Sequence, residues 1–95
     1  MKTIIWPVYI NSEHTRGEGR RLSLEESVKE PKVREISQVL RKQKIEHQVE
    51  HSKSYPGSWW ENSGYIVAER NDMSKIEFLR MIARLIKSAR ITDKN

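Results

Sequence analysis

The sequence alternates between two hydrophobic periods, and this switching constrains the fold more than any other feature. Segments 3–10, 45–51 and 64–70 alternate apolar with polar residues or are rich in β-formers, as strands are. Segments 31–44 and 75–91 instead carry apolar residues at helical spacing. The order strand-helix-strand-strand-helix predicts an α+β, two-layer sandwich, in which a three-stranded antiparallel-type sheet carries both helices on one face.

Prolines and a serine mark where these elements begin or change. Pro7 cannot donate a ladder hydrogen bond, so we expect the first strand to have an edge or a bulge there. Pro31 suits the first position of a helix, where the missing N–H needs no partner. Ser74 and Glu77 match a capping box at the start of the last helix. The alternation gives the first strand two faces, one with Ile4, Trp6, Val8 and Ile10 and the other with Ile5 and Tyr9.

The apolar stripes of the two helices predict most of the core. The first helix contributes Val33, Ile36, Val39 and Leu40. The second contributes Ile76, Leu79, Ile82, Ala83 and Ile86. A separate basic stripe on the second helix is expected to be a solvated face, with an auxiliary phosphate contact as the alternative; it consists of Arg80, Arg84 and Lys87.

Composition limits the class of protein and of partner. The chain of 95 residues is long enough for one domain, which we expect to comprise residues 1–95 with a frayed end. Its 18 Lys and Arg exceed its 13 Asp and Glu, and the net charge of +5 favours a polyanionic partner such as nucleic acid. With no cysteine, no membrane-spanning apolar run and no signal-peptide pattern, we expect a cytoplasmic protein without membrane insertion.

A long loop, NSEHTRGEGRRLS, follows the first strand. Gly17 and Gly19 lack the context of a nucleotide-binding fingerprint, so we interpret them as backbone freedom for a compact turn. Such a turn would hold Arg20 and Arg21 outward, where a guanidinium can bind phosphate or a guanine edge in bidentate fashion. Glu18 could tether an arginine or its own backbone neighbours. The alternative is a mobile, solvated loop.

Further along, Ser23 with Glu26 matches a capping box for one short turn. The second long loop, KSYPGSWW, places aromatic beside basic residues, as proteins do when they stack bases and neutralise phosphate. We expect one of its two tryptophans to be buried, and Lys53 and Tyr55 to be the RNA contacts.

Metal binding and catalysis find little support in the sequence. His47 and His51 would share a strand face, but their Cα atoms would be about 13 Å apart, too far to chelate one ion. His14 has no fixed relation to either. The chain lacks a cysteine nucleophile, a Ser-His-Asp set and an isolated pair of acids. We therefore expect a protein that is not an enzyme and that has no metal and no cofactor.

The two loops together resemble the nineteen-kilodalton subunit family of the signal recognition particle (SRP). The first family pattern is Tyr-x-(Asp/Asn)-(Ser/Asn)-x-x-(Thr/Ser)-x-x-Glu-Gly-Arg-Arg. It is matched at Tyr9, Asn11, Ser12, Thr15, Glu18, Gly19, Arg20 and Arg21. The second pattern, Lys-x-(Tyr/His)-(Pro/Ser)-x-x-Trp, is matched at Lys53, Tyr55, Pro56 and Trp59. The chain has no long lysine-rich tail, so it is similar to the archaeal form.

The resemblance implies an assembly subunit that binds the tips of two adjacent SRP RNA helices and clamps them side by side. This would prepare the RNA for the GTPase subunit of the particle, and so support protein targeting. The GTPase subunit would be reached mainly through the RNA, and the protein would be monomeric. The first tip would be contacted by Tyr9, Asn11, Ser12, His14, Thr15, Arg16, Gly19, Arg20 and Arg21. The second tip would be contacted by Lys53, Ser54, Tyr55 and Trp59.

The chain departs from the family at Glu13-His14, where relatives often carry two basic residues, and at Gly17, where they often carry alanine. We expect Glu13 to point away from RNA and His14 to make a weaker phosphate contact than lysine would. Two other functions stay open on the residues alone. One is a generic RNA-binding or ribosome-associated domain; the other is a protein-interaction module that uses Trp59 and Trp60.

Overall fold

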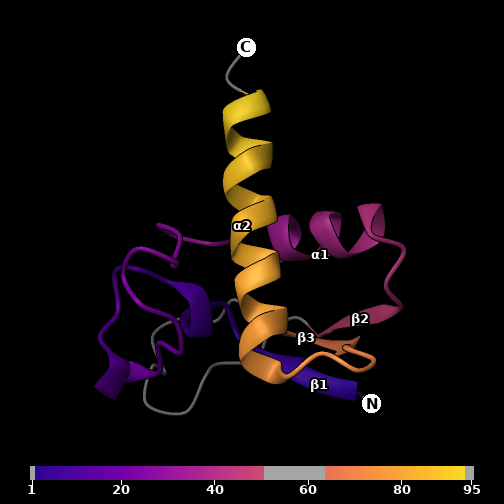
Figure 1. The fold of residues 1–95 in the computed structure, drawn as a ribbon, viewed down its shortest axis with the longest axis horizontal. Coiled ribbons are helices and arrows are strands. Elements are labelled where there is room, and N and C mark those ends of the chain that lie inside the picture. The colour runs from indigo at the N-terminus through magenta and orange to yellow at the C-terminus, as the bar shows by residue number, and fades with distance from the viewer. Residues whose placement is uncertain (1, 51–63, 94–95) are drawn as a thin grey trace.

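The computed structural model describes residues 2–50 and 64–93. Its elements follow the predicted order, with two short 3-10 helices inserted before the first α-helix (Figure 1). They are β1 (Lys2–Ile5), η1 (Pro7–Ile10), η2 (Arg16–Glu18), α1 (Val33–Lys42), β2 (His47–Glu50), β3 (Tyr65–Glu69) and α2 (Lys75–Asp93). The α+β fold expected from the hydrophobic periods is confirmed.

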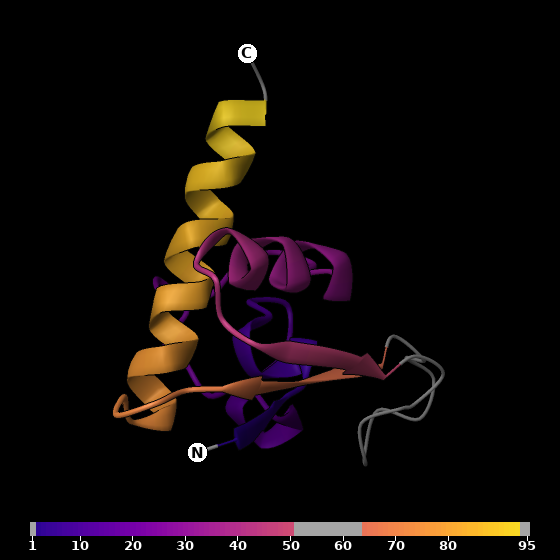
Figure 2. The same cartoon turned by 90° about the vertical axis from the view of Figure 1, so that its right-hand side faces the viewer.

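β3 is the central strand of the sheet, and both of its neighbours run antiparallel to it. It pairs with β1, where Ile5 lies opposite Ile66, and with β2, where His47 lies opposite Ala68. Because alternate strand residues point to opposite faces, Ile66 and Ala68 share one face, and both are buried. The helices lie on one side of the sheet (Figure 2), so the predicted two-layer arrangement and the antiparallel pairing of the last two strands are confirmed.

The first strand is shorter than predicted. It ends at Ile5, and Pro7–Ile10 forms the 3-10 helix η1, in which the Tyr9 N–H donates to the Trp6 carbonyl at 3.0 Å. Pro7 explains this break, because it cannot extend the ladder and its fixed φ suits the first position of a helical turn. The predicted alternation over residues 3–10 is therefore wrong: Ile4 is 44% exposed, whereas every η1 residue is buried.

Both α-helices are placed as predicted, with small shifts at their ends. Helix α1 begins at Val33 rather than Pro31, and the Lys32 N–H donates to the Glu35 carboxylate at 3.1 Å. Helix α2 begins after Ser74, whose hydroxyl accepts from the Glu77 N–H at 3.3 Å. The four predicted core positions of α1 are buried.

The core face of α2 differs from the prediction at its first turn. Ile76 is 36% exposed, while its near neighbour Phe78 is 1% exposed and fills the space instead. A helix that crosses a sheet, as α2 does in Figure 1, does not present one straight stripe to it along its whole length. The remaining predicted positions, Leu79, Ile82, Ala83 and Ile86, are buried.

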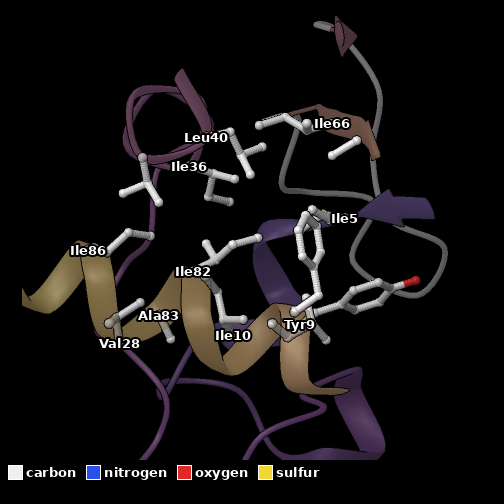
Figure 3. Packing of buried hydrophobic residues seen from close by; sticks show 14 of the residues in the cluster. Ile5, Tyr9, Ile10, Val28, Ile36, Leu40, Ile66, Ile82, Ala83 and Ile86 are labelled. Carbon is white, nitrogen blue, oxygen red and sulfur yellow. The ribbon is translucent and has the colours of Figure 1, made fainter. Parts of the chain in front are cut away.

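The core lies between the sheet and the helices, and it also takes in the long basic loop. Side chains from β1, β3, α1 and α2 meet there (Figure 3). Leu22 and Val28 join the same cluster, although both belong to the segment between η1 and α1. Burial of these two side chains attaches the loop to the scaffold.

Truncation of Leu79 to alanine should lower the free energy of unfolding by roughly 2–5 kcal/mol, because it leaves a cavity in the core. Ile76→Ala is the matched control, and it should cost less than about 1 kcal/mol because much of that side chain is already in water. Denaturant unfolding measures both. Equal losses at the two positions would contradict the orientation of α2.

Candidate nucleic-acid interface

The basic loop between η1 and α1 is closed at its base by backbone hydrogen bonds. The Val28 N–H donates to the Ile10 carbonyl, and the Ser12 N–H donates to the Val28 carbonyl, each at 2.8 Å. Together they form a parallel bridge between Asn11 and Val28. Leu22, in the middle of the loop, is 1% exposed. The loop is thus fixed at its two ends and, between them, by the burial of Leu22 and by the Arg21 N–H, which donates to the Tyr9 carbonyl at 2.7 Å.

The 3-10 helix η2 forms the outer part of the loop. The Thr15 hydroxyl accepts from the Glu18 N–H at 3.2 Å, while the Glu18 carboxylate accepts from the Thr15 N–H at 2.8 Å. The backbone hydrogen bond from Thr15 is the largest cause that lowers the pKa of Glu18. Gly19 ends the turn at a φ of 127°, which residues with a Cβ rarely adopt. Of the two roles open to Glu18, it takes the second and binds its own backbone.

The two neighbouring arginines are held differently. Arg20 is half-buried, and it donates from Nε to the Leu22 carbonyl at 2.7 Å and from Nη1 to the His14 carbonyl at 2.8 Å. Arg21 is exposed, and its guanidinium carbon lies 4.9 Å from the centre of the Tyr9 ring. The prediction that the turn holds both arginines outward is therefore correct for Arg21, whereas Arg20 uses two donors to hold the loop together.

Three of the predicted RNA-binding side chains are largely buried. Tyr9 is 6% exposed, and Asn11 and His14 are each 9% exposed. The Asn11 side-chain oxygen accepts from the Glu13 N–H at 2.9 Å, and the His14 ring lies 3.6 Å from the Glu18 carboxylate. These groups support the loop from within. The predicted contacts that are at least partly exposed are Ser12, Thr15, Arg16, Gly19, Arg20 and Arg21.

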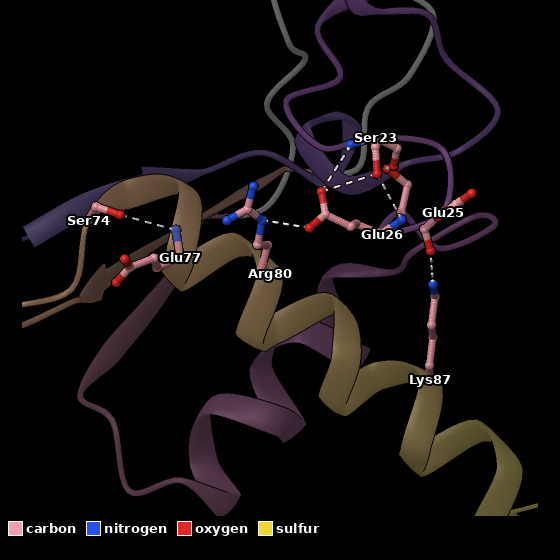
Figure 4. Close-up of polar contacts among 8 residues, drawn as sticks. Ser23, Glu25, Glu26, Ser74, Glu77, Arg80 and Lys87 are labelled. Atoms are coloured by element: carbon pink, nitrogen blue, oxygen red, sulfur yellow. Dashed lines mark hydrogen bonds and ion pairs between the residues drawn. The ribbon is translucent and has the colours of Figure 1, made fainter.

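Helix α2 braces the returning half of the loop (Figure 4). The predicted capping box is present, since the Ser23 hydroxyl accepts from the Glu26 N–H at 3.2 Å and Ser23 N–H donates to the Glu26 carboxylate at 3.4 Å. That carboxylate also pairs with Arg80 at 2.6 Å, and Lys87 donates to the Glu25 carbonyl at 2.5 Å. Two members of the basic stripe that was predicted to face solvent therefore contact the loop.

Sequence reasoning missed how the loop is anchored. Leu22 and Val28 are two of the few apolar residues in this largely polar segment, and this was the available signal that the segment packs on the core, although Leu24 is equally apolar and is 61% exposed. The contacts of Arg80 and Lys87 had no comparable signal, because residues more than fifty positions apart meet only once the fold is known.

The second predicted RNA contact lies outside the described residues, as do His51 and both loop tryptophans. The strands that flank this segment are neighbours, and Glu50 of β2 lies opposite Tyr65 of β3. The predicted contacts in question are Lys53, Ser54, Tyr55 and Trp59.

No group of three or more His, Cys, Asp or Glu residues within 2–50 and 64–93 is placed to hold a metal ion. The His47 ring nitrogens instead lie 2.9 Å from the Ser37 hydroxyl and 2.9 Å from the Ile45 carbonyl. Across the same part of the chain, no helix has the length and apolar character needed to cross a membrane.

Comparison with known proteins assigns the family. The SRP19 protein model matches residues 4–89. This chain belongs to the SRP19 family. The signal recognition particle 19 kDa protein of Methanosphaera stadtmanae is 71% identical over 90 residues, which cover 95% of this chain and 98% of that one.

Two solved members of the SRP19 family share the fold. SRP19 in a crystal structure with the S domain of SRP RNA has a TM-score of 0.82 at 32% identity, covering 88% of this chain and 95% of that one. SRP19 from the S-domain RNA complex of Sulfolobus solfataricus has a TM-score of 0.67 at 28% identity, covering 90% and 87%. The family resemblance read from the two loop patterns is thereby confirmed.

Gly19→Ala should destabilise the loop by roughly 1–3 kcal/mol, because alanine is strained at that positive φ. Gly17→Ala is the matched control within the same turn. A Cβ there meets only the Thr15 hydroxyl at 3.8 Å, an ordinary contact, so the variant should be near neutral. Amide exchange of residues 12–22 and the melting temperature check both variants. Equal sensitivity at the two glycines would contradict this geometry of the turn.

Proposed function

We propose that this protein is an RNA-binding assembly subunit of the signal recognition particle. It binds the tips of two adjacent helices of the SRP RNA and clamps them side by side. The observation that carries the proposal is the basic loop, which matches the family pattern and is anchored to the core by Leu22 and Val28. The binding of SRP19 to the S domain of SRP RNA in two related structures supports it.

Preorganisation explains why a folded loop suits this task. A mobile loop would lose conformational freedom on binding, and that loss would reduce affinity. Here the loop is closed by backbone bonds and capped at Thr15, so much of the ordering precedes the RNA. Hairpin tips splay their bases and crowd their phosphates, and a rigid loop with an exposed Arg21 can contact both.

The first tip is bound by the loop that η1 and α1 flank, with Arg21 as its central contact. Arg20 contributes the donor atoms that remain once its two internal bonds are made. Tyr9, Asn11 and His14 position the loop, and their exposed edges complete the contact. We assign the second tip to Lys53, Ser54, Tyr55 and Trp59; the match of Lys53, Tyr55 and Trp59 to the second family pattern supports the assignment, and Ser54 lies between two of these residues.

In this proposal residues 1–95 form a single RNA-binding domain that acts as a monomer in the cytoplasm. The protein catalyses no reaction and holds no cofactor or metal. Its effect is structural: it holds two RNA helices side by side. The GTPase subunit of the particle would then recognise that arrangement, mainly through the RNA.

The decisive experiment is a titration of the purified protein with SRP S-domain RNA and with the same RNA lacking one hairpin tip. A clamp gains affinity from both ends, so removal of either tip should weaken binding by tenfold or more (about 1.4 kcal/mol). Equal affinity for the intact S-domain RNA, for each of the two RNAs that lack one tip, and for an unrelated duplex would indicate a generic RNA-binding domain instead. Binding that does not change with salt would exclude phosphate contacts.

Alanine at Arg21 and at Arg20 should separate contact from support. Arg21→Ala should cost about 1–3 kcal/mol of RNA affinity at an unchanged melting temperature, because its exposed side chain makes no hydrogen bond within the described loop. Arg20→Ala should lower affinity and also speed amide exchange around His14 and Leu22, because it removes two internal hydrogen bonds. Full affinity in Arg21→Ala would remove the central contact from this site.

A further inference from the structure

The first turn of α2 carries a cation where the helix itself disfavours one. Lys75 is the first residue of the helix, and the partial charge of a helix N-terminus is positive. The lysine side chain is half-buried, and its Nζ lies 4.9 Å from the centre of the Tyr9 ring. Figure 3 shows Tyr9 beside this end of α2.

Tyr9 is shared by two cations from different parts of the chain. The Arg21 guanidinium, from the loop, also lies 4.9 Å from the centre of that ring. Because Tyr9 is 6% exposed and packed in the core, it fixes where both cations sit. Each gains a cation–π contact with the ring, and each repels the other.

A third cation adds to this charge. Arg70 follows β3, and it donates from Nη1 to the Met73 carbonyl at 2.6 Å, within the turn that leads to Lys75. Partial burial of Lys75 is the main cause that lowers its pKa, and the charges of Arg21 and Arg70 add to it. Among the described residues, the two charges that lower this pKa, those of Arg21 and Arg70, are both positive.

We propose that Lys75 and Arg21, which each lie 4.9 Å from the centre of the Tyr9 ring, bind the phosphate backbone of the RNA. The N-terminus of α2 then adds an RNA contact to those of the two long loops. This rests on the proposed function and deepens it. A lysine ammonium binds phosphate as a point charge, and the N-terminus of α2 adds the positive end of its dipole. An acidic protein partner fits less well, because Arg21 belongs to the loop assigned to RNA.

The test compares Lys75→Gln with Lys42→Gln in the full chain. Lys42 is an exposed lysine in the last turn of α1, and Figure 1 shows α1 and the basic loop on opposite sides of α2. Affinity for S-domain RNA is measured at several salt concentrations between about 50 and 200 mM. Loss of one phosphate contact should make the slope of log affinity against log salt shallower by about one unit.

Lys75→Gln should show this shallower slope, so its affinity deficit should shrink about threefold across that salt range. Lys42→Gln should keep the wild-type slope. Lys75→Arg keeps the positive charge, so it should also show the wild-type slope. The melting temperature of Lys75→Gln should stay close to that of the wild type, because the variant loses both the contact with Tyr9 and the repulsion from Arg21 and Arg70.

A wild-type slope in Lys75→Gln, while Arg21→Ala still loses affinity, would overturn the lysine contact and leave the proposed function standing. An equal change of slope in both glutamine variants would also overturn it, as a general effect of charge. Failure of the wild-type protein to prefer S-domain RNA would instead overturn the proposed function, and this contact with it. If inorganic phosphate binds saturably at Lys75 while Lys75→Gln keeps the wild-type salt slope for RNA, the site binds a free anion and the RNA contact is overturned.

Discussion

The pairing of Val28 with residues 10–12 is the constraint on which the rest of this surface depends. Two backbone hydrogen bonds of 2.8 Å bring the end of a long polar loop back to its start, and burial of the Val28 side chain seals that junction. Backbone groups in a buried position need such partners, so this closure also satisfies the chain where it enters the core. With the base fixed, the short turn at Thr15–Gly19 can form far from the sheet and still hold a defined position.

Local patterns predicted most of the fold, and their failures occur where a tertiary contact overrides them. The capping box at Ser23, the hydrogen bond of the Ser74 hydroxyl at the start of α2 and the α1 stripe depend on neighbours within one turn, and they are present as expected. Ile76 has the same local pattern, but the crossing of α2 over the sheet leaves it exposed. Pro7 did predict an interruption of the first strand. The sequence alone could not show that all residues of η1 would be buried, because their burial depends on how they pack under α2.

The sequence singles out the residues of the basic loop, but it does not show the position that each side chain takes within the loop. Arg20 and Arg21 are adjacent and chemically identical, so no pattern separates them. The structure does: one guanidinium bonds to two loop carbonyls and the other lies over an aromatic ring. His14 likewise belongs to the matched region, yet its burial makes it part of the loop's interior. Motif residues therefore divide into those that shape the loop and those that it displays.

Three carboxylates of this region are bound to partners within the protein and do not pair with Arg21. Glu18 binds the backbone of its own turn, Glu26 binds Ser23 and Arg80, and Glu35 makes two hydrogen bonds to Arg90 that, as the largest cause, lower its pKa. These acids are engaged in shaping the loop and joining the helices, so they do not neutralise Arg21. A net charge of +5 favours an anionic partner, but in the loop the exposed Arg16 and Arg21 lie near the exposed Glu13 and Glu25 in the sequence. The position of each cation, rather than an excess of charge, therefore decides where an anion can bind.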